Sequence, residues 1–322
     1  MAPFRDHAYA FRRQIRPVVN YIRRPAAIGF VMQDWWRCAR TGFRAAPLTG
    51  EMPVEWNSKH TIWMAWTGEN PVPGYLELCL ESVRRHNTEM CNVVVITPSN
   101  LHEYFPKLHP AYPFLSYVHR SDYLRCQALH LYGGMYLDMD TICFRPLHQW
   151  WSVLEEYDFA GYDGRPSSQL FGMGVLGPAR RKSNLTTAWE AELHRVLDRR
   201  YADLVAFRET NNDLSKDCLG WTEILGDIVK QVSITLAEKH RLSFKRISRR
   251  YFSLSADLFT NAELFEQAIL RVSPNTYLVT MNNEMYPNEL KRRTRHEVST
   301  LDWGIVSLLR QALGASLPPL ET

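Results

Sequence analysis

Two aspartates separated by one residue, Asp138 and Asp140, are the clearest candidates for chemistry in this 322-residue sequence. Side chains alternate along an extended segment, so both carboxylates are expected to project to the same side. Hard divalent cations such as Mg²⁺ or Mn²⁺ bind carboxylate oxygens together with the oxygens of a substrate phosphate. A cation held here would neutralise the charge on a departing diphosphate. The pair therefore predicts a leaving-group clamp rather than a covalent nucleophile.

The same segment admits a second interpretation. Residues 138–142 read DMDTI, which also resembles the DxDxT signature of haloacid-dehalogenase-like phosphatases, with isoleucine at the place of the threonine. The first aspartate of that signature is a nucleophile. That signature normally ends the first strand of its domain, whereas two expected strands precede it here. It also requires a later acidic pair for its metal, and the sequence offers no convincing Asp-Asp downstream. A phosphatase is therefore kept as the alternative.

The elements before this pair have the order of an α/β fold. Residues 61–66 are an apolar run that predicts a buried strand, and an amphipathic helix follows from Pro73 to about residue 87. Residues 92–97 are a β-branched run, typical of a strand covered on both faces. A β-α-β order implies a parallel sheet.

The segment that delivers the aspartates is a helix followed by a short strand. The spacing predicts a helix over residues 121–132 with Ser121 as its N-cap, ended by the glycine pair at 133–134. Residues 135–137 then form a strand that places both carboxylates at its carboxyl end. In open α/β sheets that end is where ligands bind.

This arrangement closely resembles a known family. Residues 121–125 (SDYLR) and 132–140 (YGGMYLDMD) are similar to the glycosyltransferase sugar-binding region containing the DXD motif. That region is shared by capsular polysaccharide synthesis proteins, the yeast initiating mannosyltransferase and the catalytic domains of clostridial glucosylating toxins. Residues 62–68 (IWMAWTG), with residues 78–87 after them, look like the opening of the capsular branch. The resemblance covers residues 58–150.

The resemblance implies a GT-A-like α/β fold, with a mixed, mostly parallel sheet flanked by helices. It implies a hexosyltransferase that moves a hexose from a UDP- or GDP-sugar to a glycan or other hydroxyl acceptor. It also implies Mn²⁺ or Mg²⁺ as cofactor and retention of the anomeric configuration. Carried over by position, Asp138 and Asp140 would hold the metal and the diphosphate, while Asp122 and Arg125 would contact the donor sugar and phosphate. Taken alone, the latter two would also fit a plain i,i+3 helix salt bridge.

Other site residues follow the family pattern less closely. An early tryptophan stacks on the nucleobase in the family, and both Trp63 and Trp66 fit, with Trp63 slightly favoured. One metal contact comes from a C-terminal loop in the family, and the candidates for it are Asn282, Asn283 and Glu284. Many members also close the site with a late histidine and tryptophan, for which His296 and Trp303 are the candidates.

The acceptor side departs from the family. Residues 219–223 read LGWTE where many members carry a Gly-Pro pair, so the acceptor contacts cannot be carried over. A retaining enzyme needs no protein base. An inverting one requires a carboxylate base, for which Asp163 or Glu223 are the first candidates. A protein that binds glycans or nucleotide sugars without catalysis is the alternative of a different class.

Charge and composition set the remaining expectations. The net charge is +4, which gives no indication of nucleic-acid binding, and the excess charge lies at the start of the chain. Apolar and arginine residues alternate at helical spacing over residues 1–24, which fits peripheral contact with an anionic membrane or a helix packed on the catalytic domain. The six cysteines are scattered and read as buried hydrophobes, so a cytoplasmic protein is expected. The expected divisions are an extension and linker over 1–56, a catalytic domain over 57–300 and a helix and tail over 301–322.

Overall fold

The structure is a computed structural model that describes residues 60–162, 175–177, 181–239, 241–248, 250–281, 283 and 286–314. The predicted extension over residues 1–56, with its basic stretch, lies outside the described residues. So do Asp163, Asn282 and Glu284. Among the helices that are described, none is long and apolar enough to cross a membrane.

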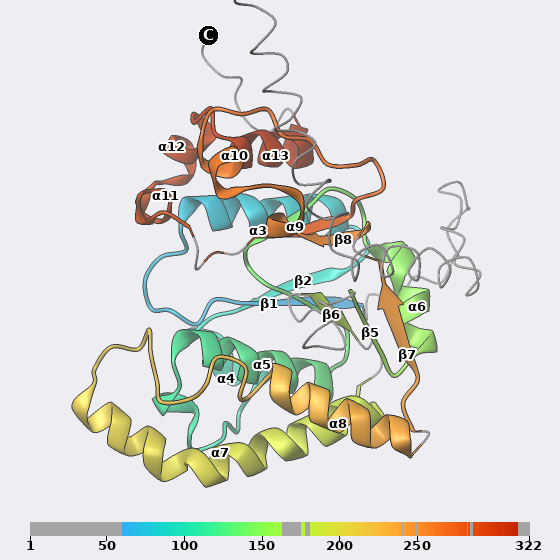
Figure 1. Cartoon of the computed structure of the whole chain (residues 1–322), viewed down its shortest axis with the longest axis vertical. Helices are drawn as coiled ribbons and strands as arrows, with labels where there is room; N and C mark the ends of the chain where they lie inside the picture. The colour runs from blue at the N-terminus through green and yellow to red at the C-terminus, as the bar shows by residue number, and fades with distance from the viewer. Residues whose placement is uncertain are drawn as a thin grey trace, which may run out of the picture. The chain divides into compact units, whose positions relative to one another are not determined.

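A six-stranded sheet runs through the middle of the described unit (Figure 1). Its strands, in spatial order, are β2 (Asn92–Ile96), β1 (Thr61–Ala65), β3 (Met135–Leu137), β6 (Val175–Gly177), β5 (Phe159–Tyr162) and β7 (Phe244–Ile247). Strand β1 is parallel to β2 and β3, and β5 is parallel to β7, whereas β6 is antiparallel to both of its neighbours. The predicted parallel start and mostly parallel sheet are confirmed.

A second, three-stranded sheet begins directly after the aspartate pair. Its order is β4 (Thr141–Cys143), β9 (Leu278–Thr280) and β8 (Phe252–Leu254), with β9 antiparallel to β4 and parallel to β8. The backbone N–H of Met281 donates to the carbonyl of Asp140 at 2.9 Å, which continues the β4–β9 pairing toward the motif. Residues 138–140 are therefore held between two sheets.

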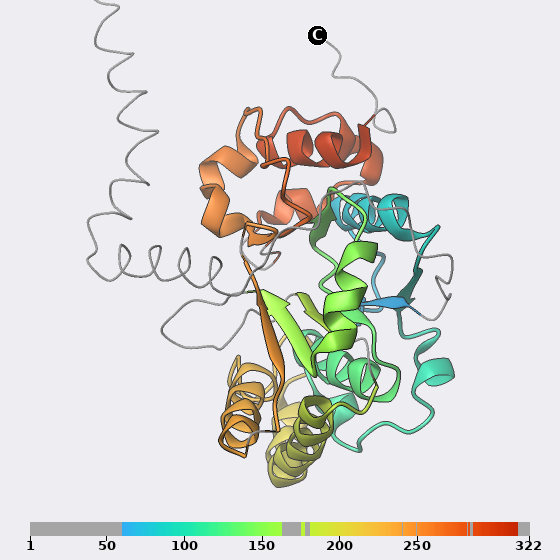
Figure 2. The ribbon, with the colours of Figure 1, turned by 90° about the vertical axis from the view of Figure 1, so that its right-hand side faces the viewer.

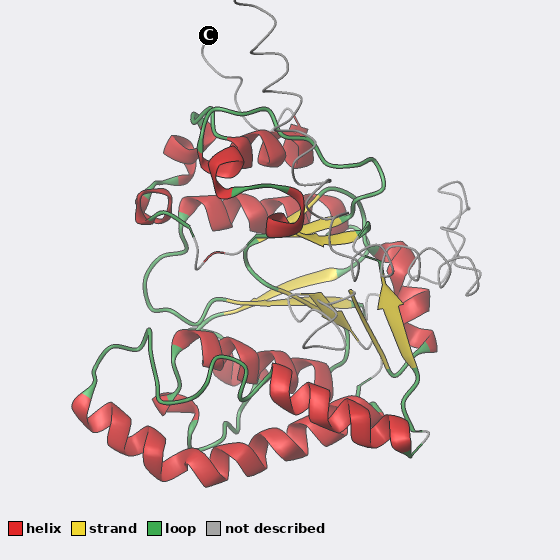
Figure 3. Ribbon diagram, viewed as in Figure 1, coloured by secondary structure: helices red, strands yellow, loops and turns green. Residues whose placement is uncertain are grey.

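Helices form a layer on each face of the main sheet, as Figure 3 shows by colour. One layer consists of α3 (Gly74–Asn87), α9 (Ser255–Leu258), α10 (Asn261–Phe265), α11 (Asn288–Arg292), α12 (Arg295–Ser299) and α13 (Gly304–Leu313). The other consists of α4 (Leu101–Tyr104), α5 (Tyr117–Leu131), α7 (Asn184–Thr210) and α8 (Gly226–Glu238). Helix α6 (Trp151–Glu156) stands beside the β5 and β7 edge (Figure 2).

The hydrophobic core between the sheet, α5 and α7 fixes the position of the helix that carries site residues. Helix α5 buries Tyr123, Leu124 and Ala128, and α7 packs beneath it with Trp189 and Leu193 fully buried. Leu124 and Ala128 are four residues apart on α5, and Trp189 and Leu193 are four residues apart on α7, so each pair lies on the face that its helix turns toward the core. The site side chains on α5 are therefore carried by a helix buried between the sheet and α7.

The start of α5 differs from the sequence prediction. Ser121 was expected to be the N-cap, but the helix begins at Tyr117 and its N-cap is Ser116, whose hydroxyl accepts from the His119 N–H. Ser121 lies in the second turn, where its hydroxyl is 2.8 Å from the hydroxyl of Tyr136. The prediction was wrong because a serine can satisfy a tertiary partner as well as a helix end.

The glycine pair ends α5 as predicted. Gly133 and Gly134 have φ of 72° and 101°, a backbone region that favours glycine. A Cβ on Gly134 would lie 2.4 Å from the carbonyl oxygen of Thr61, so no larger residue fits against β1. This close approach sets β3 beside β1 and brings the aspartates to the sheet edge.

The other predicted elements are partly confirmed. The sequence also has helical patterns over 184–207, 222–232 and 299–313; the first is α7, whereas the other two helices begin later, as α8 and α13. Residues 169–176 read as a further strand, which falls mainly outside the described residues, and only its end appears in β6. Five cysteines are described; all are free and four of them are buried, as predicted.

Candidate active site

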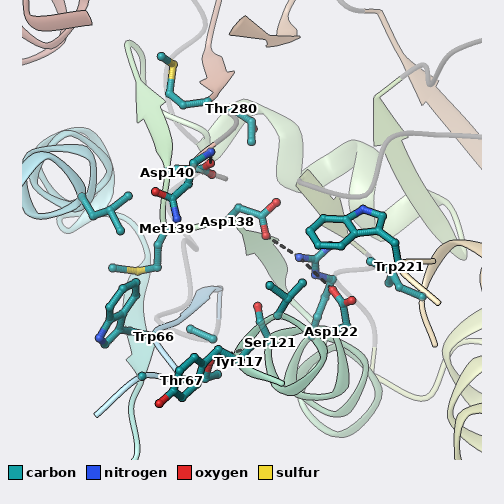
Figure 4. A pocket seen from close by; sticks show the side chains of 18 of the residues that line it. Trp66, Thr67, Tyr117, Ser121, Asp122, Asp138, Met139, Asp140, Trp221 and Thr280 are labelled. Atoms are coloured by element: carbon teal, nitrogen blue, oxygen red, sulfur yellow. Dashed lines mark hydrogen bonds and ion pairs between the residues drawn. The ribbon is translucent and has the colours of Figure 1, made fainter. Parts of the chain in front are cut away.

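A cavity of about 680 Å³ opens at the carboxyl ends of β1 and β3 (Figure 4). It lies between the first half of α5, the residues that follow β1, the start of β4 and the segment 211–225 that joins α7 to α8. This volume falls in the range of small-molecule sites, and the carboxyl edge of a parallel sheet is their usual place. The sequence predicted this edge.

Asp138 and Asp140 both line the cavity. Asp138 follows β3 directly and its side chain is 29% exposed, whereas the next aspartate is 8% exposed. The carboxylate of Asp140 accepts a hydrogen bond from the backbone N–H of Asn283 at 2.8 Å. The structure therefore brings together three of the residues expected to hold a metal, while Glu284 lies outside the described part of the chain.

Burial makes the charged form of this pair unfavourable. Burial and the neighbouring charge of Asp138 together raise the pKa of Asp140 to about 8, against the hydrogen bond from Asn283. Burial also raises the pKa of Asp138 to about 6, which the Arg125 guanidinium opposes. Two neighbouring carboxylates that resist ionisation together are suited to a bound cation, which removes their repulsion.

The donor set fits a hard divalent cation. The side-chain oxygen of Asn283 is buried, lines the cavity and has no hydrogen-bond partner within the described part of the chain. No cluster of three or more histidine, cysteine or acidic side chains with metal-ligand geometry occurs among the described residues. Two carboxylates and an amide oxygen match Mg²⁺ or Mn²⁺, which complete their coordination with substrate phosphates and water. The residues present therefore fit the implied metal.

Arg125 connects helix α5 to the aspartate motif. Its Nη2 lies 2.5 Å from Asp138 Oδ1 and 3.6 Å from Asp122 Oδ1. Its guanidinium also lies over the Tyr136 ring, 4.6 Å from the centroid. Burial lowers the pKa of Arg125, but the interactions with Asp138, Tyr136 and Asp122 together outweigh burial, and the pKa is raised. The guanidinium is thus a fixed positive charge at the cavity wall.

Asp122 is buried beside this guanidinium and also lines the cavity. Burial raises its pKa, while the charge of Arg125 lowers it. The i,i+3 helix pair that the sequence left as an alternative is present, but the shorter contact of Arg125 is the one to Asp138. Arg125 therefore connects Asp122 on α5 to Asp138 at the end of β3.

The two candidate tryptophans occupy different environments. Trp63 is 3% exposed, donates its indole N–H to the Gly133 carbonyl at 2.8 Å and lies outside the residues that line the cavity. Trp66 lines the cavity, and its indole N–H donates to the Asn70 carbonyl at 2.8 Å. The structure reverses the order of preference, because Trp63 is needed in the core and Trp66 is open to a ligand.

The weaker candidates from the sequence lie elsewhere. The carboxylate of Glu223 accepts the Gly220 N–H at 2.9 Å and pairs with Arg200 at 3.2 Å, so its bonds are structural. His296 is exposed on α12, and Trp303 packs against Phe265 with ring centroids 6.1 Å apart. None of these three is among the described residues that line the cavity.

The cavity-lining residues that were not predicted as site residues include Ser121, Trp221 and Lys291. Ser121 was assigned to the helix cap, and the sequence assigned no role to Lys291. Trp221 was noticed only as a departure from the family pattern. The signal that could have found it is a large apolar side chain between glycine and threonine in an otherwise polar connection.

Comparison with known proteins supports the family resemblance. Residues 50–169 match the family described as capsular polysaccharide synthesis protein, which confirms the resemblance found in the sequence. This segment contains β1 to β5 and both aspartates of the motif. A search of curated proteins gives no significant match.

Solved structures that match the chain include several glycosyltransferases. For GlyE from Streptococcus pneumoniae TIGR4 the identity is 15% and the TM-score 0.41, with 83% of this chain and 66% of that chain covered. For the galactosyltransferase LgtC in complex with donor and acceptor sugar analogs the values are 13% and 0.38, with 81% and 97% covered. For mouse xyloside xylosyltransferase 1 they are 14% and 0.38, with 71% and 99% covered. The chain thus spans just under two thirds of the GlyE structure.

Proposed function

We propose that this chain, whose residues 50–169 match the capsular polysaccharide synthesis family, is a metal-dependent glycosyltransferase. It would transfer a hexose from a UDP- or GDP-sugar to a hydroxyl of a glycan acceptor. The observation that carries the proposal is that Asp138, Asp140 and the unpartnered oxygen of Asn283 line the same cavity at the sheet edge. This geometry suits a cation that is shared with a diphosphate.

Each side chain has a distinct part in this proposal. A divalent cation held by Asp138, Asp140 and Asn283 would neutralise the charge that develops on the diphosphate as the sugar departs. Arg125 presents a second positive charge at the same wall, and its stacking on Tyr136 keeps it in place without solvent reorganisation. Trp66, at the end of β1, offers an indole face to the base of the nucleotide.

Asp122 is assigned to the donor sugar. It is buried on α5 next to Arg125 and reaches the cavity, so its carboxylate can accept hydrogen bonds from sugar hydroxyls. Its position beside the cation site places it where a hexose attached to the diphosphate would lie. The raised pKa of Asp122, caused by burial, favours a partner that donates hydrogen bonds.

The structure favours retention over inversion. An inverting transfer needs a carboxylate base close to the acceptor hydroxyl. Glu223, one of the two candidates, is occupied by Gly220 and Arg200, and it lies outside the cavity lining. The other candidate, Asp163, lies outside the described residues. In a retaining transfer the departing phosphate can itself accept the acceptor proton, and no carboxylate base is required.

The phosphatase alternative is less well supported. Its nucleophile would have to follow the first strand of the domain, but Asp138 follows the third strand in chain order, β3. The carboxylate would also have to be free to attack phosphorus, whereas Asp138 Oδ1 lies 2.5 Å from Arg125 Nη2. A protein that only binds nucleotide sugars is the remaining alternative, and sugar release separates it from an enzyme.

The proposal is tested by a donor screen. The full chain is incubated with Mn²⁺ or Mg²⁺ and a panel of UDP- and GDP-sugars, and free nucleotide is measured. We expect release from one donor, about 100-fold slower or more in Asp138→Ala and unchanged in the exposed control Asp302→Ala. Folded protein that is silent with every donor would contradict the proposal. Metal-dependent cleavage of p-nitrophenyl phosphate instead would identify the phosphatase.

A further inference from the structure

Trp221 stands out on the connection between α7 and α8. It is 61% exposed, although it is one of the residues that line the cavity. Its neighbours in the same segment are treated differently, since Ile224 and Leu225 are buried and Leu219 packs against the core. The segment therefore buries its smaller apolar side chains and leaves the largest one open to the cavity.

The exposure of Trp221 is maintained by a network of bonds that fixes the segment. Asp217, whose side chain is 1% exposed, accepts from the Ser116 N–H at 2.7 Å and from the Leu219 N–H at 2.9 Å, and it pairs with His119 at 2.8 Å. The Tyr117 N–H donates to the Leu214 carbonyl at 2.9 Å. These bonds tie the segment to the first turn of α5.

Two arginines of α7 hold the same segment from the other side. Arg208 donates to the carbonyls of Asp213 and Lys216, at 2.8 and 2.9 Å. Arg200 donates to the Cys218 carbonyl at 2.8 Å. An aromatic surface on so constrained a backbone is pre-organised, so a ligand can bind to it without ordering the loop.

The position of Trp221 indicates which ligand, donor or acceptor, it would contact. Figure 4 shows Trp66 and Trp221 on opposite sides of Asp138, and in this view Asp122 lies on the side of Trp221. A donor whose base stacks on Trp66 and whose diphosphate lies at Asp138 fills the first side. The indole of Trp221 therefore faces the space beyond the donor sugar, from which an acceptor must approach.

The surroundings of Trp221 suit a carbohydrate. A pyranose ring has an apolar C–H face that packs on an indole and a rim of hydroxyls that need hydrogen-bond partners. Ser215 and Thr222 line the cavity on the same segment, and their hydroxyls donate to the carboxylates of Asp213 and Asp227 at 2.7 and 2.9 Å. Each hydroxyl oxygen can still accept a hydrogen bond from a sugar hydroxyl.

We propose that Trp221 is the stacking platform for a pyranose ring of the acceptor glycan. This inference rests on the proposed transferase function and names the acceptor side of the same site. The ring would pack against the exposed indole, with its reacting hydroxyl directed toward the donor sugar at Asp122. Trp221 would thus determine acceptor affinity, while the cation site and Trp66 determine donor affinity.

The test compares Trp221→Ala, Trp221→Phe and Tyr201→Ala, the last a control that removes an exposed aromatic ring from α7. Binding of each protein to an array of immobilised glycans is measured with Mn²⁺ and UDP or GDP present, and nucleotide affinity is measured by calorimetry. We expect Trp221→Ala to weaken glycan binding about tenfold, with Phe recovering most of it and Tyr201→Ala resembling the wild type. Nucleotide affinity should change less than twofold.

The outcomes separate this inference from the proposed function. Wild-type protein that releases nucleotide from a donor but binds no array glycan would overturn the platform alone. Equal glycan binding by Trp221→Ala and wild type, or an equal loss of nucleotide affinity, would overturn it as well. Failure of donor release in the wild type would instead contradict the transferase, whatever the glycan array shows.

Discussion

The guanidinium of Arg125 and the carboxylate of Asp138 are joined at 2.5 Å, across the junction between α5 and the end of β3. The arginine reaches this position from the middle of a buried helix and is held there by the Tyr136 ring. A single contact therefore couples the helix that carries the candidate sugar ligand to the motif that carries the candidate metal ligands. Tyr136 itself belongs to β3, so the coupling extends to the sheet.

Arg125→Lys should impair the site even though it keeps the charge. Lysine lacks the planar fork that reaches Asp138 and Asp122 together, and it stacks poorly on Tyr136. We expect kcat/KM for donor release to fall about 100-fold, while Arg195→Lys, in an exposed pair with Glu192, stays at the wild-type value. A loss of less than threefold would show that the fork has no role in the reaction.

Arg125→Ala should also destabilise the protein. It leaves Asp122 buried without its compensating charge and removes one contact from the half-buried Asp138. We expect the free energy of unfolding to fall by about 3 kcal/mol, measured by urea denaturation. An unchanged free energy would mean that solvent already neutralises these carboxylates.

Cation binding should release a proton near neutral pH. Burial raises the pKa of Asp140 to about 8, so the free carboxyl is largely protonated at pH 7 and must ionise to bind a metal. The affinity for Mn²⁺ should therefore rise with pH, by up to about tenfold per unit between pH 6 and 8. Calorimetry in two buffers of different ionisation enthalpy measures the proton directly, and a value of zero would contradict the raised pKa.

The His119 and Asp217 pair should stabilise the fold in a defined pH window. The hydrogen bond to Asp217 raises the pKa of His119 against the effect of burial, and the same bond lowers the pKa of Asp217 against burial. The stabilisation that comes from a raised histidine pKa is fully present below the unfolded pKa of about 6.5, and it is lost as the pH rises through the folded pKa. The stabilisation that comes from a lowered aspartate pKa is present above the unfolded pKa of about 3.9, and it is lost as the pH falls through the folded pKa.

The corresponding variant is Asp217→Asn. It should cost about 2 kcal/mol at pH 5.5, because a charged hydrogen bond is replaced by a neutral one. The difference from wild type in urea unfolding should shrink toward pH 8.5, as the pH rises through the raised pKa of His119. A difference that is the same at both pH values would exclude a charged pair.

Substitution of the two tryptophans should separate stability from binding. Trp63→Ala removes a buried ring from the core and should cost about 3 to 5 kcal/mol of unfolding free energy. Trp66→Ala should leave stability almost unchanged and weaken binding of UDP or GDP about tenfold or more, because base stacking is lost. Calorimetry and urea denaturation of both variants provide the comparison. Normal nucleotide affinity in Trp66→Ala would indicate that the nucleobase binds elsewhere in the cavity.

The aspartate end of the site follows from local sequence. The glycine pair forces a left-handed turn, Gly134 must approach the Thr61 carbonyl closely, and a short apolar strand follows. The turn and the strand are properties of a few adjacent residues and could be predicted, whereas the approach of Gly134 to Thr61 joins two distant segments and could not. Which of the two tryptophans lines the cavity could not be predicted, because Trp63 and Trp66 belong to the same short apolar run.

The opposite wall of the site could not be predicted. Asn283 and Lys291 reach the cavity only because β9, a strand of three residues, pairs with β4 across more than 130 positions. A strand of this length carries no detectable period. The segment with Trp221 is likewise placed by bonds such as that from Tyr117 N–H to Leu214, which no local pattern encodes.

The most direct test of the account is whether donor release depends on a cation at the aspartate pair. The wild-type chain, Asp138→Ala and Asp302→Ala are stripped with EDTA, and release of nucleotide from the active donor is followed before and after Mn²⁺ is added. We predict that release stops in EDTA and is restored by Mn²⁺ in the wild type and Asp302→Ala, but not in Asp138→Ala. Release that continues in EDTA, or that Mn²⁺ restores in Asp138→Ala, would contradict the account.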